Sequence, residues 1–155
     1  MGLTNIGEQV VLNRIFGGIA TGTINAELDG NQVYKLALYT AVADAENFSG
    51  TECGGSAGGG TAYEAQVINF GSLTEATATA TNSTDLESTV TFTSDAGSDW
   101  GTITDYGIHV VAGSGTSVSN GTCIFTGTWD SSAVVNTGDT VQVVAGPTGL
   151  VITVT

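Results

Sequence analysis

The sequence predicts an all-β protein: an antiparallel, jelly-roll-like β-sandwich of about eight or nine strands with a short N-terminal helix. Three observations lead to this prediction. Charged residues make up only 11% of the 155 residues and 23 are glycine, a composition that favours extended strands and turns over helices. Hydrophobic residues reach 41%, too many for a disordered chain. Short apolar–polar alternations recur between turns at even spacing, as they do in β-sandwiches.

The N-terminal stretch is the one place where a helix is expected. Asn5 can cap a helix over residues 5–16, and Glu8, three residues later, can complete a capping box. The glycine pair at 17–18 can end it. So short a helix is marginal on its own and must pack against another element.

The apolar face of this helix either covers the open end of the sandwich or docks on a neighbouring subunit. We therefore divide the chain into an N-terminal helix or arm, residues 1–18, and a single β-sandwich domain, residues 19–155. The candidate partner-binding residues on this face are Ile6, Val10, Ile15 and Phe16.

The expected strands follow in order, each with alternating side chains and turn residues at its ends. The first is followed by a glycine-rich loop over residues 47–60, which lacks the Gly-Lys-Ser/Thr ending and the helix start of a phosphate-binding loop. The expected strands cover residues 33–43, 61–70, 75–81, 88–93, 100–110, 121–129, 134–135, 141–145 and 150–154.

Residues 100–110 are predicted to form a central core strand. Trp100 and Tyr106 share a parity and should face the core, whereas Ile103 breaks that parity, which indicates a β-bulge directly after it. The chain's single histidine, His109, falls on the opposite side of the strand. This strand is therefore expected to form the core of the sandwich and to hold no catalytic residue.

No arrangement of residues predicts catalysis, a cofactor or a metal site. One imidazole without a nucleophile elbow does not make a catalytic triad, and the Asp95–Asp99 turn lacks the ligand order of an EF-hand. Two cysteines are too few for a disulfide scaffold. Cys53 and Cys123 either pair in an oxidising medium or, as we favour, remain reduced and partly buried. We expect no enzymatic activity.

The charge balance excludes several partner classes. Fifteen acidic residues stand against Arg14 and Lys35, giving a formal net charge of −13, so neither nucleic acid nor an anionic membrane is an expected partner. No apolar run approaches the roughly 20 residues of a membrane span. No secretory signal is evident, which predicts synthesis in a cytoplasm. Tyr39, off the core parity of its strand, is the one candidate for an exposed sugar-binding ring.

Several motifs in order resemble a family of small virion structural proteins of tailed bacteriophages, which includes tail-fibre and capsid decoration proteins. The most specific piece is Trp-Gly-Thr-Ile-Thr-Asp-Tyr-Gly-Ile at 100–108, preceded by Leu-Ala-Leu-Tyr-Thr at 36–40. A Gly-Asp-Thr turn at 138–140 and a closing Leu-Val-Ile-Thr strand at 150–153 complete the resemblance, which covers nearly the whole chain.

The resemblance implies a non-enzymatic virion protein. Our first hypothesis is a capsid decoration (cement) protein that binds the major capsid protein on the outer surface of the virion, as a homo-oligomer and most simply a trimer. The alternative is a tail-fibre or baseplate domain that contacts tail proteins and binds a host-surface glycan. A polysaccharide hydrolase is the least favoured possibility.

Overall fold

The structure is a computed structural model, which describes residues 2–4, 7, 32–53, 63–70, 82–94, 99–112, 118, 121–146 and 151–154. All strand pairs among these residues are antiparallel, which confirms the predicted all-β class. The strands are β1 (Gly2–Leu3), β2 (Gln32–Asp44), β3 (Ser49–Glu52), β4 (Gln66–Ile68), β5 (Asn82–Asp85), β6 (Val90–Thr93), β7 (Gly101–Ala112), β8 (Thr122–Val135), β9 (Thr140–Val143) and β10 (Val151–Val154).

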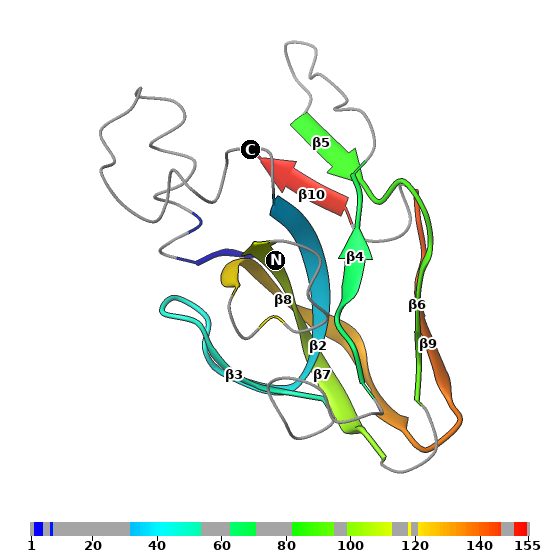
Figure 1. Ribbon diagram of the computed structural model, residues 1–155. Coiled ribbons are helices and arrows are strands. Elements are labelled where there is room, and N and C mark those ends of the chain that lie inside the picture. The colour runs from blue at the N-terminus through cyan, green and yellow to red at the C-terminus, as the bar shows by residue number, and fades with distance from the viewer. Residues whose placement is uncertain are drawn as a thin grey trace.

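One large sheet organises the described strands (Figure 1). Its order is β1-β8-β7-β2-β3, and β4 also pairs with β2. The outer edge of β2 is divided between two partners, because β4 pairs with Tyr34–Leu36 and β3 pairs from Tyr39 onward. The ribbons β6–β9 and β5–β10 are separate two-stranded sheets.

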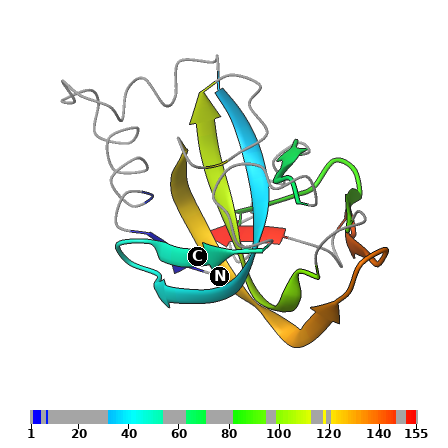
Figure 2. The same ribbon diagram turned by 60° about the horizontal axis from the view of Figure 1, so that its bottom comes forward.

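The main core lies between the large sheet and the β6–β9 ribbon, which both ribbon views place to one side of β2, β7 and β8 (Figures 1 and 2). This two-layer packing confirms the predicted sandwich. Its buried members include Leu36, Leu38, Ile68, Phe92, Trp100, Ile103, Tyr106, Ile108, Val135 and Val143. The predicted core positions of Trp100 and Tyr106 are thus confirmed, at 3% and 9% exposure.

The predicted bulge after Ile103 is confirmed, since the register between β7 and β8 shifts between Ile103 and Asp105. The two strands expected over residues 121–129 and 134–135 are a single strand, β8. The register shift between β7 and β8 lies in the middle of this strand. Gly127 stands directly opposite Tyr106, whose ring lies over it: a Cβ there would be 2.8 Å from Tyr106 Cε1 and nearer still to the hydroxyl. The large ring thus requires glycine on the neighbouring strand.

Tyr63 closes the gap between β4 and β3 on the edge of β2. Its hydroxyl accepts a hydrogen bond from the Leu38 backbone N–H at 2.7 Å, in a position where no strand partner reaches. The ring packs against Phe92, with centroids 6.2 Å apart, and edge-on against Trp100 at 5.2 Å. The Leu38 carbonyl, in turn, accepts from the N–H of Cys53. One side chain therefore satisfies the edge of the sheet and fills the core.

Several expectations differ from the structure or fall outside the described residues. β3 lies within the region expected to be a loop, and the strand expected at 75–81 is not among the described residues, whereas β5 begins at Asn82. Most of residues 5–18 also lie outside them, so the helix and the domain division stay predictions. Thr4 Oγ1 does accept a 3.0 Å bond from Gly7 N–H, an N-capping contact one residue before the expected cap. Within the described part of the chain, no helix has the length and apolarity needed to cross a membrane.

Candidate functional site

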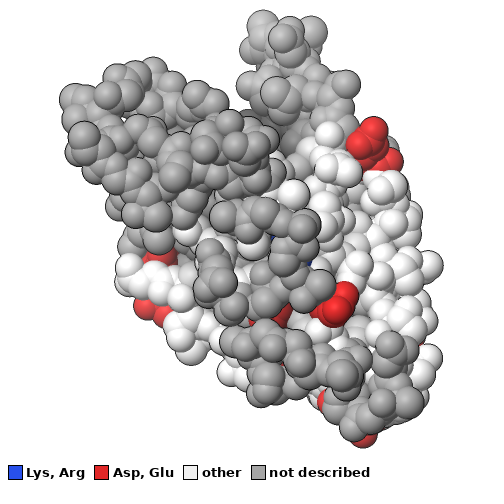
Figure 3. All heavy atoms as spheres, viewed as in Figure 1, with Lys and Arg blue, Asp and Glu red and all other residues white. Residues whose placement is uncertain are grey.

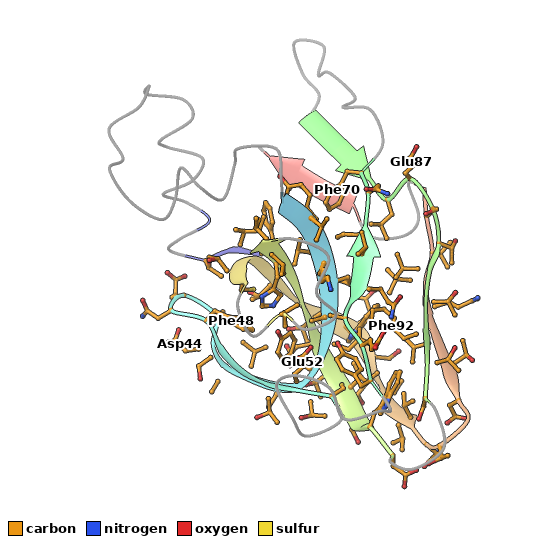
Figure 4. The ribbon with its side chains drawn as sticks, in the orientation of Figure 1. Asp44, Phe48, Glu52, Phe70, Glu87 and Phe92 are labelled. Atoms are coloured by element: carbon orange, nitrogen blue, oxygen red, sulfur yellow. The ribbon has the colours of Figure 1, made fainter. Side chains whose placement is uncertain are left out.

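The second face of the large sheet carries the polar residues that could be functional. Because side chains alternate along β2, Lys35 and Tyr39 point away from the face that holds Leu36 and Leu38. This second face is also buried: Ala37, Tyr39, Ala65, Val111 and Val118 form a second, smaller core cluster. In Figure 4, Phe48 and Phe92 lie on opposite sides of β2 and so mark the two faces.

Tyr39 is not the exposed ring that its parity suggested. It is 2% exposed, so the expectation that its ring is exposed at the surface was wrong. Its ring lies between glycines of the two neighbouring strands, since a Cβ at Gly50 of β3 or at Gly107 of β7 would come within 2.9 and 3.1 Å of ring atoms. Parity identified the correct face of β2, but that face is covered rather than open to solvent.

His109 is bound to Tyr39 across the sheet. Its Nε2 shares a 2.7 Å hydrogen bond with the Tyr39 hydroxyl, while its Nδ1 is buried and has no hydrogen-bond partner among the residues that the structure describes. The side chain is 3% exposed, and this burial lowers the pKa of His109 to about 4. The imidazole is therefore neutral at neutral pH. The prediction that it lies on the opposite side of the strand from Tyr106 is confirmed, although that side is not solvent.

The two thiols lie on opposite faces of the large sheet. Cys53 follows Glu52, the partner of Tyr39, and belongs to the main core, whereas Cys123 is the register partner of His109 on the second face. Both are free and buried, so the disulfide considered as one alternative is not formed in this structure. Burial raises the pKa of each thiol to about 12, which leaves both protonated and weakly nucleophilic at neutral pH.

Lys35 is a buried cation that sequence reasoning did not single out. It is 2% exposed and pairs in register with His109 on β7. Burial lowers the pKa of Lys35, and the carboxylates of Glu64 and Glu52 oppose that shift. The sequence did contain a signal for this burial. Lys35 shares the parity of Tyr39, and β2 carries apolar residues on both faces, as a strand buried on both sides does.

Glu52 is the half-buried carboxylate beside this cation. Burial raises the pKa of Glu52 to about 7, against the opposing effects of a hydrogen bond from Tyr63 and the charge of Lys35. A carboxyl with such a pKa changes its charge near neutrality, which an exposed glutamate does not do.

On the face shown in Figure 3, the visible Asp and Glu side chains are spread over several places and do not gather in one patch. No group of three or more potential metal ligands gathers among the residues that the structure describes. Asp99 of the expected turn accepts bonds from Thr137 N and Oγ1, and residues 95–98 lie outside the described set. The candidate docking residues Ile6, Val10, Ile15 and Phe16 also lie outside it.

Comparison with protein families gives the decisive observation. Residues 2–150 match the family model described as "Podophage GP4 fiber I protein gp80". The chain belongs to this family. It is therefore a structural protein of a bacteriophage virion, as the order of its motifs suggested. No curated protein matches it.

The matched range contains both faces of the large sheet, including the 100–108 motif that carried the resemblance. Two glycine–tyrosine contacts explain why glycine and tyrosine stand side by side in the motif and on the strands next to it. Tyr106 covers Gly127 on the core face, and Gly107 leaves room for Tyr39 on the second face. In this chain, tyrosine and glycine residues of the motif thus contribute to the packing of both faces of the sheet.

Proposed function

We propose that the protein is a non-enzymatic structural subunit of a tail fibre. The observation that carries this proposal is the family match over residues 2–150 to a protein described as a fibre protein. The burial of the chain's single imidazole and both thiols supports a structural role, because these groups are withdrawn from solvent and neutral at neutral pH. Tail proteins are then the expected partners, and glycan binding loses Tyr39 as its candidate residue.

Self-association is part of this proposal, with a trimer as the simplest assembly. Support comes from the outer edge of β8. Among the described strands, β1 pairs with this edge only at Phe125 and Thr126. Residues 128 and 130–134 of β8 are exposed, and Val134 is 65% exposed. A strand edge that is largely unpaired among the described strands and carries exposed side chains suits pairing between subunits. Light scattering coupled to size-exclusion chromatography should give a mass above one subunit; a monomer at high concentration would contradict self-association.

The location is tested on intact virions. Fab fragments raised against the protein should label tail appendages in electron micrographs, and quantitative mass spectrometry should give a low copy number relative to the major capsid protein. The capsid protein serves as the internal standard because its copy number is fixed by the lattice. Fab density over the head, together with a copy number close to that of the lattice, would refute the fibre assignment. It would assign the protein to capsid decoration, the role first expected from the sequence.

A further inference from the structure

Three side chains form a row across the second face of the large sheet. Lys35 on β2, His109 on β7 and Cys123 on β8 are successive register partners, so His109 has Lys35 on one side and Cys123 on the other. All three are at most 5% exposed. Directly opposed side chains in antiparallel strands are close neighbours, and like charges in such a pair are destabilising. The row therefore tolerates a neutral His109 far better than a charged one.

A hydrophobic cover closes over this row. The β2–β3 hairpin carries Phe48 in its turn, and the Phe48 ring meets the rings of Tyr39 and His109 nearly edge-on, at centroid distances of 5.2 and 5.3 Å. Tyr39, His109 and Cys123 converge over Gly107: a Cβ there would lie 3.1 Å from Tyr39 Cε2, 3.0 Å from His109 Nε2 and 3.2 Å from Cys123 Sγ. Movement of the imidazole would therefore uncover the thiol beside it.

Adding a proton to His109 conflicts with this arrangement in two ways. A charged imidazole has two N–H donors that both need acceptors, but Nδ1 has none among the described residues and at Nε2 the Tyr39 hydroxyl could act only as an acceptor. The new charge would also stand opposite the ammonium of Lys35. Both conflicts disappear when the imidazole reaches water.

We propose that protonation of His109 by solvent breaks its bond with Tyr39 and lifts the turn of the β2–β3 hairpin that carries Phe48, while the pairing of β3 and Cys53 with β2 is kept, so that His109 and the neighbouring Cys123 become accessible. This acid-triggered switch is a property of the fold and does not depend on whether the protein serves in a fibre or on a capsid. The other titratable groups facing the row from the described elements are Tyr39, Glu52, Glu64 and Asp105.

Of the neighbouring acids, Glu52 adds to the effect. The pKa of Glu52 lies at about 7, so Glu52 loses its charge first as the pH falls and no longer offsets Lys35. His109, with its pKa lowered from 6.5 to about 4, takes up its proton afterwards. A depressed histidine pKa favours the closed state above pH 6.5, and this preference is lost as the pH falls through the range down to about 4. Opening is therefore expected between these two values.

The two cysteines are built-in reporters, because they lie on opposite faces of the same sheet. The full-length protein would be labelled between pH 7.5 and 3.5 with an aromatic disulfide that reacts with thiols in acid, and each site quantified by peptide mass spectrometry. We expect Cys123 to react at least tenfold faster at pH 4 than at pH 7.5, while Cys53 stays protected. Simultaneous exposure of both thiols would indicate global unfolding and overturn the proposal.

Two variants link the opening to the imidazole. His109→Gln keeps an acceptor for the Tyr39 hydroxyl but cannot titrate, so Cys123 should remain protected at pH 4; an unchanged acid step would overturn the proposal. Should this variant fail to fold, Tyr39→Phe provides an independent test. It removes the bond to Nε2, and the midpoint of Cys123 labelling should move to higher pH. A midpoint equal to that of the wild type would count equally against the switch.

Discussion

Replacing Tyr63 by phenylalanine removes a single oxygen from the point where the edge of β2 has no strand partner. The Leu38 side chain is fully buried and its N–H would lose its acceptor, since that bond runs to the Tyr63 hydroxyl at 2.7 Å. The ring would keep its packing against Phe92 and Trp100. The variant therefore isolates the polar contribution of Tyr63.

The expected cost follows from the group left unsatisfied. Leaving a buried backbone donor without a partner costs about 1–3 kcal/mol. For a chain of this size, each kcal/mol lowers the melting temperature by roughly 2–4 °C. A loss of about 2 kcal/mol in the free energy of unfolding, measured by urea titration, is thus expected together with a melting temperature lower by roughly 4–8 °C.

The matched control is Tyr34→Phe, which removes the hydroxyl oxygen from a tyrosine of β2 that is 37% exposed. Its free energy of unfolding should stay within about 0.5 kcal/mol of the wild type. Amide hydrogen exchange gives a local reading, since the Leu38 N–H should exchange faster in Tyr63→Phe alone. Equal stability of the two variants, with unchanged exchange at Leu38, would refute the role given to Tyr63.

Two further predictions address packing and charge. Gly127→Ala should destabilise the fold by about 1–3 kcal/mol, because its Cβ would displace the Tyr106 ring; a urea midpoint equal to that of the wild type would contradict the close approach. Glu52 has a pKa raised from 4.5 to about 7, so its contribution to stability is fully present below pH 4.5 and is lost as the pH rises through 7. The free energy of unfolding of the wild type minus that of Glu52→Gln should accordingly fall by about 2 kcal/mol between pH 4.5 and 8, after discounting for solvent screening. Parallel pH profiles of the two proteins would disprove the shifted pKa.

Local patterns predicted the parts of the fold that depend on alternation along one strand. The parity of Trp100 and Tyr106 identified the core face of β7, and the break at Ile103 located the bulge. By contrast, Cys123 and Phe125 are two residues apart and would share a face in a regular strand, yet they pair with His109 and Ile108, which point to opposite faces. A register shift between strands separates them, and a single strand's sequence does not contain that information.

By itself, the sequence determined an all-β chain with a Trp-containing central strand and a place among bacteriophage virion proteins, because composition, alternation and motif order are all local. Only the tertiary structure decided that the second face of the large sheet is also buried. On that face, Tyr39 lies between two glycines and His109 is the buried register partner of Lys35. The two cysteines are both buried and free. The physical reason is that alternation assigns a side chain to one of two faces, whereas the cover over each face comes from other segments of the chain, whose positions depend on the whole fold.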